Sequence, residues 1–340
     1  MKLAESVLSG NRLALSRLIT QVENNTPEGL EALGSLFANT GRAHLIGVTG
    51  APGTGKSSLV NRLARHYRQV QAGRKDTSVA IIAVDPSSPF SGGALLGDRI
   101  RMRDLSGDPN VFIRSMASRG SLGGLARSTS GVVQALDAAG YDIILIETVG
   151  AGQAEVDIAR LAHTTLVVEA PGLGDDIQAI KAGILEIADI LVINKADRPG
   201  VENTERALRS MLDLSYPVRR SFRGGNLEKV KAKDESIWQV PIQRTVATEG
   251  TGIQELSELI SRHKAYLVET NEWERRDQER LESELENLIR LTLMRRFRST
   301  VEDDRYREIV SRLISRSISP HQAVAELLGG LNRGNGDHPV

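Results

Sequence analysis

Residues 45–58 read LIGVTGAPGTGKSS, a short apolar run followed by a glycine-rich turn and a lysine-serine pair. The turn fits G-x-x-x-x-G-K-[ST], and a helical segment, SSLVNRLARHY at 57–67, follows it. Between a strand and a helix, such glycines let backbone N–H groups surround phosphate oxygens, and the helix N-terminus adds positive potential. The stretch predicts a phosphate-binding loop in which Lys56 bridges the β- and γ-phosphates and Ser57 ligates Mg²⁺. The predicted nucleotide contacts here are Gly50, Ala51, Pro52, Gly53, Thr54, Gly55, Lys56, Ser57 and Ser58.

Further apolar runs of strand length lie on the C-terminal side of this loop. They are VAIIAV at 79–84, IILIE at 143–147, TTLVVEA at 164–170, DILVIN at 189–194 and a run near VPIQRTVA at 240–247. Runs that are apolar at consecutive positions suit strands covered on both faces, and their alternation with helical stretches predicts an α/β fold with a mostly parallel central sheet. Ligands of such folds gather at the carboxyl ends of the strands.

The base of the expected nucleotide is indicated by the end of the run DILVIN. Asn194, Lys195 and Asp197 form the pattern N-K-x-D. An aspartate in that place accepts hydrogen bonds from guanine N1–H and the 2-amino group, and a polar site of this kind rejects adenine by roughly 10⁴-fold. The sequence therefore predicts that GTP and GDP bind. The segment 245–248 is placed to offer the backbone N–H of Ala247 to guanine O6.

Two other apolar runs end in carboxylates. Asp85 follows VAIIAV, and Glu147 follows IILI and is followed by Gly150. A carboxylate at such a strand end can hold a metal-bound water, and the Gly150 amide can sense the γ-phosphate. The motif of Ras-like proteins here is D-x-x-G, so Glu147 departs from it, and its longer side chain favours an outer-sphere role. The structural alternative is that Asp85 and Glu147 cap helices or loops.

Composition limits the classes of function. The chain of 340 residues has 43 basic and 43 acidic side chains, 40% hydrophobic residues and no cysteine. A net charge of zero disfavours nucleic-acid binding, and the frequent charges disfavour a membrane span. The absence of cysteine excludes disulfides and thiolate metal sites and is compatible with a reducing compartment. We therefore expect a cytoplasmic protein with no nucleic-acid or membrane partner.

Helical patterns flank the predicted sheet. We expect an N-terminal helical segment at 1–42, broken near Gly10, a GTPase domain at 43–262, a C-terminal helical dimerisation region at 263–331 and a flexible tail at 332–340. Leu281, Leu285 and Leu288 form a narrow apolar seam on a long charged helix, which predicts a homodimer because pairing with a second copy buries the seam. The alternative is that this helix packs along its own GTPase domain.

Several stretches resemble one family, the MeaB/ArgK GTPases, which act as chaperones of adenosylcobalamin-dependent acyl-CoA mutases. Besides the phosphate loop and N-K-x-D, they are VDPSSPFSGGALLGDRIRM at 84–102, SRGSLGGLARST at 118–129, ETVGAGQAEVD at 147–157 and APGLGDDIQAIKAGILEIAD at 170–189. The resemblance implies that Lys56, Asp85, Asp98 and Glu147 act in hydrolysis and that Ser57, Asp85, Asp98 and Glu147 surround Mg²⁺. It also implies that Asp175 and Lys181, in a mobile segment called switch III, couple the nucleotide to the mutase.

The same resemblance implies the partners. They are an adenosylcobalamin-dependent acyl-CoA mutase, with methylmalonyl-CoA mutase as the expected enzyme, and the adenosyltransferase that serves it. Hydrolysis is expected to be slow alone and stimulated by the partner.

Two other functions compete with this interpretation. A GTP-dependent metal insertase of the nickel type has a related fold, but it would need a cluster of thiolates or histidines, whereas the six histidines are dispersed along the chain. A kinase of a transport-binding protein would transfer phosphate to a protein acceptor, and the guanine-reading N-K-x-D argues against an ATP-using kinase.

Overall fold

The computed structural model describes residues 2–69, 77–86, 102, 104–105, 107–118, 124–148, 154–172, 186–215 and 237–329. Two compact units divide the chain, Met1–Leu281 and Glu282–Val340. The first unit holds the sheet and every predicted nucleotide-binding residue. Asp98, Gly150, Asp175 and Lys181 lie outside the described residues, as does the side chain of Asp85.

The first unit is built on a seven-stranded sheet with the order β3-β2-β4-β1-β5-β6-β7, and every strand pair is parallel. The α/β fold with a parallel sheet is thereby confirmed. The strands are β1 (His44–Thr49), β2 (Val79–Pro86), β3 (Val111–Ser118), β4 (Ile143–Thr148), β5 (Thr164–Glu169), β6 (Ile190–Asn194) and β7 (Ile242–Thr245). The sequence patterns predicted six of them and missed β3.

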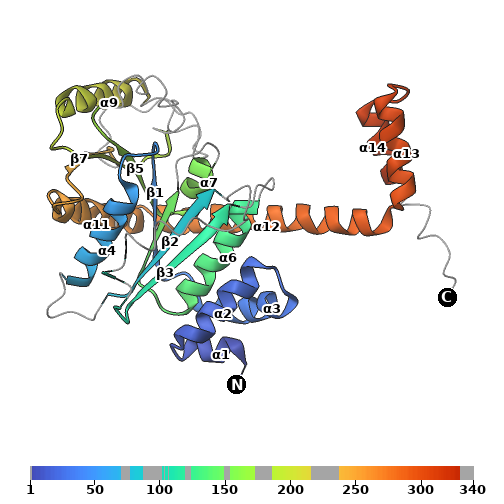
Figure 1. Cartoon of the computed structure of the whole chain (residues 1–340), viewed down its shortest axis with the longest axis horizontal. Coiled ribbons are helices and arrows are strands. Elements are labelled where there is room, and N and C mark those ends of the chain that lie inside the picture. The colour runs from blue at the N-terminus through green and yellow to red at the C-terminus, as the bar shows by residue number, and fades with distance from the viewer. Residues whose placement is uncertain are drawn as a thin grey trace. The chain divides into compact units, whose positions relative to one another are not determined.

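Helices cover both faces of this sheet (Figure 1). On one face lie α4 (Lys56–Gln69) and α11 (Ile253–Glu269), and on the other lie α6 (Gly124–Ala138) and α7 (Ala154–Leu161). Alternate residues of β1 serve the two faces, because Leu45 packs with the α6 side and Ile46 with the α4 side. Helix α9 (Val201–Ser215) packs beside β6. A core on both sides explains the uninterrupted apolar runs.

The N-terminal helices extend the core of the first unit. They are α1 (Leu3–Leu8), α2 (Arg12–Glu23) and α3 (Pro27–Leu36), followed by a short 3₁₀ turn (Phe37–Asn39). The predicted break near Gly10 is confirmed, since Gly10 has φ 82° and Asn11 caps α2 by accepting from the backbone N–H groups of Leu13 and Ala14. Leu18 and Ile19 of α2 are fully buried and belong to the same core as α6.

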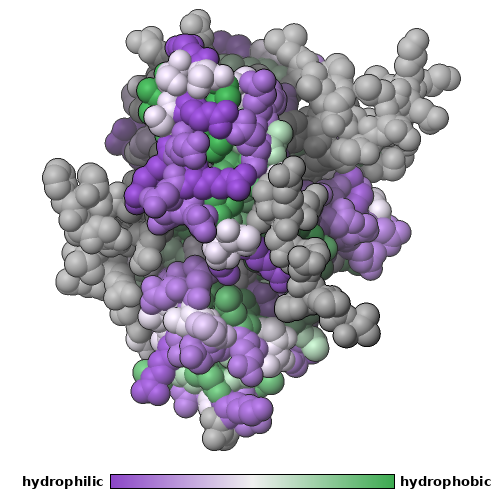
Figure 2. All heavy atoms as spheres, turned by 90° about the vertical axis from the view of Figure 1, so that its right-hand side faces the viewer, coloured by the Kyte–Doolittle hydropathy of each residue, from purple (hydrophilic) through white to green (hydrophobic). Residues whose placement is uncertain are grey.

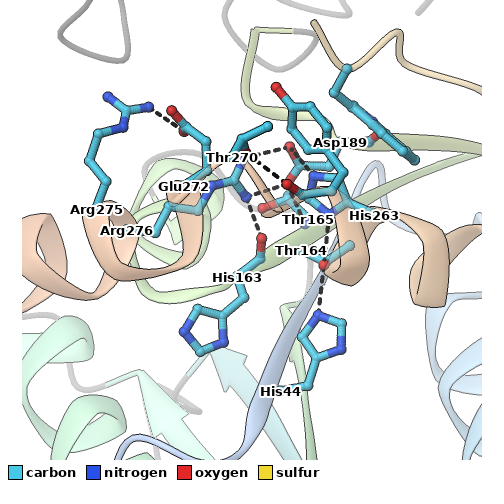
Figure 3. A network of polar contacts seen from close by, with 12 residues as sticks. His44, His163, Thr164, Thr165, Asp189, His263, Thr270, Glu272, Arg275 and Arg276 are labelled. Carbon is cyan, nitrogen blue, oxygen red and sulfur yellow. Dashed lines mark hydrogen bonds and ion pairs between the residues drawn. The ribbon is translucent and has the colours of Figure 1, made fainter. Parts of the chain in front are cut away.

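A buried polar network lies at the amino-terminal ends of strands β1, β5 and β6 (Figure 3). The phosphate loop lies at the opposite, carboxyl-terminal ends of the strands. Thr164 Oγ1 lies 2.8 Å from His44 Nε2 and 2.9 Å from Nδ1 of His263 on α11. His163 is buried beside them, with its ring centroid 6.1 Å from that of His44. Three histidines dispersed along the sequence thus meet here. Within the described part of the chain, these side chains make no group suited to a metal ion.

The first turns of α12 (Glu272–Thr300) complete this network. The Arg276 guanidinium donates to both carboxylate oxygens of Asp189, at 3.0 and 3.1 Å, and to the carbonyl of His163 (Figure 3). His163 Nε2 lies 3.1 Å from Asp277, and its ring stacks on Trp273 with centroids 3.8 Å apart. These contacts join the start of α12 to the amino-terminal ends of strands β5 and β6.

The long charged helix expected to carry Leu281, Leu285 and Leu288 is α12, and α11 precedes it as a separate helix. Helix α11 ends at Glu269 and α12 begins at Glu272, because Asn271 takes the left-handed conformation with φ 56°. The predicted boundary between residues 262 and 263 lies inside α11, and the first compact unit continues to Leu281.

The second unit holds the rest of α12 with α13 (Asp303–Ile314) and α14 (Pro320–Gly329). Its small core gathers Ile309, Ala323 and Leu327. The described residues of α12 include none that is buried. On the face drawn in Figure 2, hydrophobic residues emerge as separate patches among hydrophilic ones. Among the described helices, none has the length and apolar character needed to cross a membrane.

Candidate nucleotide-binding site

The phosphate loop connects β1 to α4. Its backbone conformation and its close neighbours require glycine at two positions, Gly50 and Gly55. Gly50 has φ 135°, and a Cβ there would lie 2.1 Å from the carbonyl oxygen of Val168 on β5. Gly55 has φ 91°, and its Cβ would lie 2.5 Å from the side-chain nitrogen of Asn194. The loop therefore fits against β5 and β6 only without side chains at these two positions.

Lys56 is the first residue of α4, and its side chain folds back along the loop. The ammonium donates to the carbonyl oxygens of Gly50 at 2.8 Å and of Ala51 at 2.9 Å, and the residue is 5% exposed. The positive charge thus lies inside the loop that the α4 N-terminus closes. Loop amides, helix dipole and ammonium together form a setting for a polyanion.

Ser57 and Glu147, both predicted near the metal, are brought together. The Ser57 hydroxyl donates to Glu147 Oε1 at 2.5 Å, although the two residues lie 90 positions apart. Glu147 is 5% exposed near the end of β4, and one residue on, Thr148 donates to Thr49 at the end of β1 at 3.1 Å. The parallel pairing of β1 with β4 delivers the carboxylate beside the phosphate loop. Asp85 lies in the neighbouring strand β2.

Asn194 joins the predicted guanine motif to the phosphate loop. Its side-chain NH₂ donates to the carbonyl of Thr54 at 2.8 Å, and its Oδ1 accepts from the Thr245 hydroxyl at 3.2 Å and from the Ala247 backbone N–H at 3.1 Å. The buried Asn194 amide thus uses both its NH₂ group and its oxygen. It holds the phosphate loop, its own loop and the segment 245–247 at a fixed spacing.

A cavity of about 260 Å³ lies between this motif and the end of β5. Lys195, with φ 58°, lines it and donates from Nζ to the Gly53 carbonyl at 2.6 Å. The exposed carboxylate of Asp197 follows two residues later. The cavity is lined by Gly53, Ala170, Pro171, Gly172, Lys195, Arg198 and Pro199. Gly53 of the phosphate loop and Lys195 of N-K-x-D both line it, so the cavity lies between the two motifs.

The sequence patterns gave no indication of one further contact to this site. Arg62 of α4 donates from Nε to the Ala247 carbonyl at 3.1 Å and from Nη2 to the Thr248 carbonyl. An arginine on a predicted amphipathic helix is an ordinary surface residue, and 185 positions separate it from Ala247. The fold, which packs α4 beside α11 and the 246–252 loop, brings them together.

Comparisons with known proteins agree with this geometry. The family model described as "Methylmalonyl Co-A mutase-associated GTPase MeaB" matches residues 15–302. A protein of Pyrococcus abyssi named as a GTPase is 42% identical over 333 residues, which cover 97% of each chain. The protein named GTPase ArgK from Escherichia coli is 33% identical over 96% of this chain and 95% of its own.

The fold also matches a solved structure. A crystal structure titled as a LAO/AO transport system kinase superposes with a TM-score of 0.66 at 23% sequence identity, over 97% of this chain and 96% of the other. At that identity the likeness supports the fold alone. The family model covers most of the chain, and the relatives named as GTPases match it nearly end to end. The chain belongs to the MeaB family of methylmalonyl-CoA mutase-associated GTPases.

Proposed function

We propose that this protein is a cytoplasmic chaperone that binds and hydrolyses GTP in order to gate cofactor delivery to, and protect, an adenosylcobalamin-dependent acyl-CoA mutase. The observation that carries the GTP part is the Asn194 side chain, which bonds the phosphate loop through Thr54 and the predicted guanine loop through Ala247. The family name supports the mutase part, with methylmalonyl-CoA mutase as the proposed enzyme and its adenosyltransferase as a further partner.

Mg²⁺ fits the residues at the phosphate loop. A serine hydroxyl and a buried carboxylate 2.5 Å apart form an oxygen donor set of the kind that this cation prefers. In this proposal Ser57 ligates the ion, and Glu147, Asp85 and Asp98 hold its water ligands. Bound Mg²⁺ supplies neutralisation of the charge on the β- and γ-phosphates.

The chain's own residues would do the rest of the binding. The loop amides from Gly50 to Ser58 and the Lys56 ammonium hold the phosphates, and the Gly150 amide reports the presence of the γ-phosphate. Asp197 selects guanine through two hydrogen bonds. We propose that Asp175 and Lys181 transmit the nucleotide state to the mutase, as loops that contact the γ-phosphate do in other nucleotide switches.

We further propose that two copies associate through α12. Leu285 is 58% exposed, and Leu281 and Leu288 on the same helix are 38% and 40% exposed. Spacings of four and three residues place these leucines in one stripe. A second copy of the helix would bury the stripe and bring charges of opposite sign together.

The test of this function is hydrolysis with and without partner. Purified protein is incubated with GTP and Mg²⁺, alone and with an adenosylcobalamin-dependent methylmalonyl-CoA mutase, and phosphate release is followed. We expect slow release alone and faster release with the mutase, and Lys181→Ala should reduce the stimulated rate more than the basal rate. Binding of the mutase without a change in rate would contradict the coupling, while hydrolysis of ATP at the GTP rate would contradict the nucleotide assignment.

A further inference from the structure

Arg62 crosses from the phosphate-loop helix to the loop expected to meet the guanine base. It lies on α4, six residues after Lys56, and its guanidinium donates to the carbonyls of Ala247 and Thr248. Its side chain also runs alongside Gly250, where an added Cβ would lie 3.7 Å from Arg62 Cδ. One side chain therefore donates to two residues of the 246–252 loop and lies beside a third.

The loop itself is closed on its own backbone. The N–H of Val246 donates to the carbonyl of Thr251 at 3.0 Å, and the N–H of Gly250 donates to the carbonyl of Val246 at 2.9 Å. Gly252 has φ 76°, and a Cβ there would lie 2.1 Å from the Arg244 carbonyl oxygen. The loop is thus a compact turn closed by its own backbone hydrogen bonds.

Asn194 and Arg62 hold this turn from two sides. The N–H of Ala247 donates to Asn194 Oδ1 at 3.1 Å, while the carbonyl of the same residue accepts from Arg62 Nε at 3.1 Å. In a planar trans peptide the C=O and the following N–H point in opposite directions. Because Arg62 draws the Ala247 carbonyl toward α4, the N–H of Thr248 points away from α4. The direction of the amides in this turn is therefore fixed by side chains outside it.

We propose that Arg62 is a positioning residue for guanine selectivity, which holds the 246–252 turn so that the N–H of Thr248 is directed at guanine O6, in place of the Ala247 N–H, which donates to Asn194. The proposal rests on the proposed binding of GTP and GDP and adds a residue that no motif identifies. It separates two parts of base recognition: Asp197 reads N1–H and the 2-amino group, whereas the turn held by Arg62 reads O6.

The test uses GDP and two base analogues, each compared between variant and unmutated protein. GDP carries O6, N1–H and the 2-amino group, the 2-aminopurine ribonucleoside diphosphate lacks O6 and with it the proton on N1, and IDP lacks only the 2-amino group. Calorimetric titration of Arg62→Met, which keeps the aliphatic stem, should show GDP affinity reduced roughly tenfold. Affinity for the analogue without O6 should change little, while the ratio of GDP to IDP affinity stays as in the unmutated protein.

Two further variants control the result. Arg65→Met makes the same change on the same helix, where Arg65 pairs with Asp104 at 2.9 Å, and it should leave all three affinities unchanged. Arg62→Lys keeps one charged donor and should recover part of the selectivity; it also replaces Arg62→Met in the comparison if that variant does not fold. Equal weakening of all three diphosphates, or no weakening, would overturn the role of Arg62. Failure of the unmutated protein to prefer GDP over ADP would instead overturn the proposed function.

Discussion

Asn194 and Asp197 show how differently residues of one short motif are used. Asn194 is 2% exposed, and its side-chain amide forms hydrogen bonds with Thr54, Thr245 and Ala247. Its role is therefore to hold the loops of the site together. Asp197 is exposed, which leaves its carboxylate available to a ligand. The motif thus combines a residue that sets the spacing of the loops with a residue that chooses the base.

This division gives a prediction for Asp197→Asn. The carboxylate accepts from both N1–H and the 2-amino group of guanine, whereas an asparagine NH₂ would face that amino group donor to donor. We expect GDP affinity to fall by roughly a hundredfold or more, and affinity for xanthosine diphosphate, which has an oxygen at C2, to rise. Competition binding against a fluorescent nucleotide measures both, and an unchanged preference for GDP would show that Asp197 does not read the base.

A second residue-level prediction concerns acid stability and the buried histidines. Burial, reinforced by the nearby positive charge of Lys264, holds the pKa of His44 well below its usual 6.5. Burial also lowers the pKa of His163, although Asp277 opposes that shift. Both side chains therefore stay neutral in the folded protein, while the unfolded chain binds protons near pH 6.5. Folding stability should be unaffected by these groups well above pH 6.5 and should fall as the pH drops below it.

Chemical denaturation between pH 7.5 and 5.5 measures this slope. One proton taken up on unfolding changes the free energy of unfolding by about 1.4 kcal/mol per pH unit. His44→Gln keeps a hydrogen-bonding group near Thr164 but cannot titrate, so its stability should fall less steeply than that of the unmutated protein. Parallel slopes for the two proteins would count against a neutral buried His44.

At the scale of elements, an ion pair with little solvent exposure attaches Arg276, at the start of α12, to Asp189, the residue before β6. Asp189 and Arg276 side chains are 2% and 10% exposed. Removing one member of such a pair leaves the other charge buried, so Arg276→Ala should lower the free energy of unfolding by about 3–5 kcal/mol. Arg275→Ala, next to it but paired with Glu272 and Glu279 at more exposed positions, should cost about 1 kcal/mol or less.

The double variant Asp189→Asn with Arg276→Met provides a sharper check of the same pair. Because it removes both charges together, it should be less destabilised than Arg276→Ala alone. Urea denaturation of the three variants gives the comparison. A double variant destabilised as much as Arg276→Ala, or more, would mean that the two side chains do not interact as a pair.

Most of the strands that the sequence predicted lie inside the sheet, and of the two edge strands, β7 was predicted near VPIQRTVA whereas β3 was missed. Strands β1, β4, β5 and β6 lie in the sheet interior, and their continuous apolar runs were readable without any structure. Strand β3, VFIRSMAS, lies at the edge, where Arg114 can turn to Glu23 of α2 at 3.0 Å, so polar residues interrupt its pattern. The separation of α11 from α12 depends on the left-handed Asn271, and no change in periodicity marks it.

The candidate site divides in the same way. The phosphate loop and N-K-x-D are local in sequence, because backbone amides and consecutive side chains do the work, and they were found directly. Ser57 and Glu147 were both expected near Mg²⁺, because the carboxyl ends of parallel strands lie together, but no direct contact between them was predicted. Arg62 could not be found, since its contact with Ala247 depends on how α4 packs beside a loop that is 185 positions away.

For the whole molecule, the exposed stripe on α12 predicts the state of association. Light scattering at micromolar concentration should give twice the chain mass of 36.9 kDa. Leu285→Asp should shift this toward a single chain, because it places a charge in the stripe at a position that is 58% exposed. Leu13→Asp, at a 62% exposed leucine of α2, is the matched control and should remain a dimer. A monomeric unmutated protein would rule out the α12 pairing.

The network around Asp189 also determines where the chain can be shortened. Trp273, Arg276 and Asp277 pack within the first unit, so a fragment that stops after α11 would lose the guanidinium that faces the Asp189 carboxylate. A fragment that runs to Leu281 keeps it. Limited proteolysis should accordingly spare 272–281 and cut later in α12. The smallest autonomously folding GTPase fragment should therefore include residues 272–281 at its C-terminus.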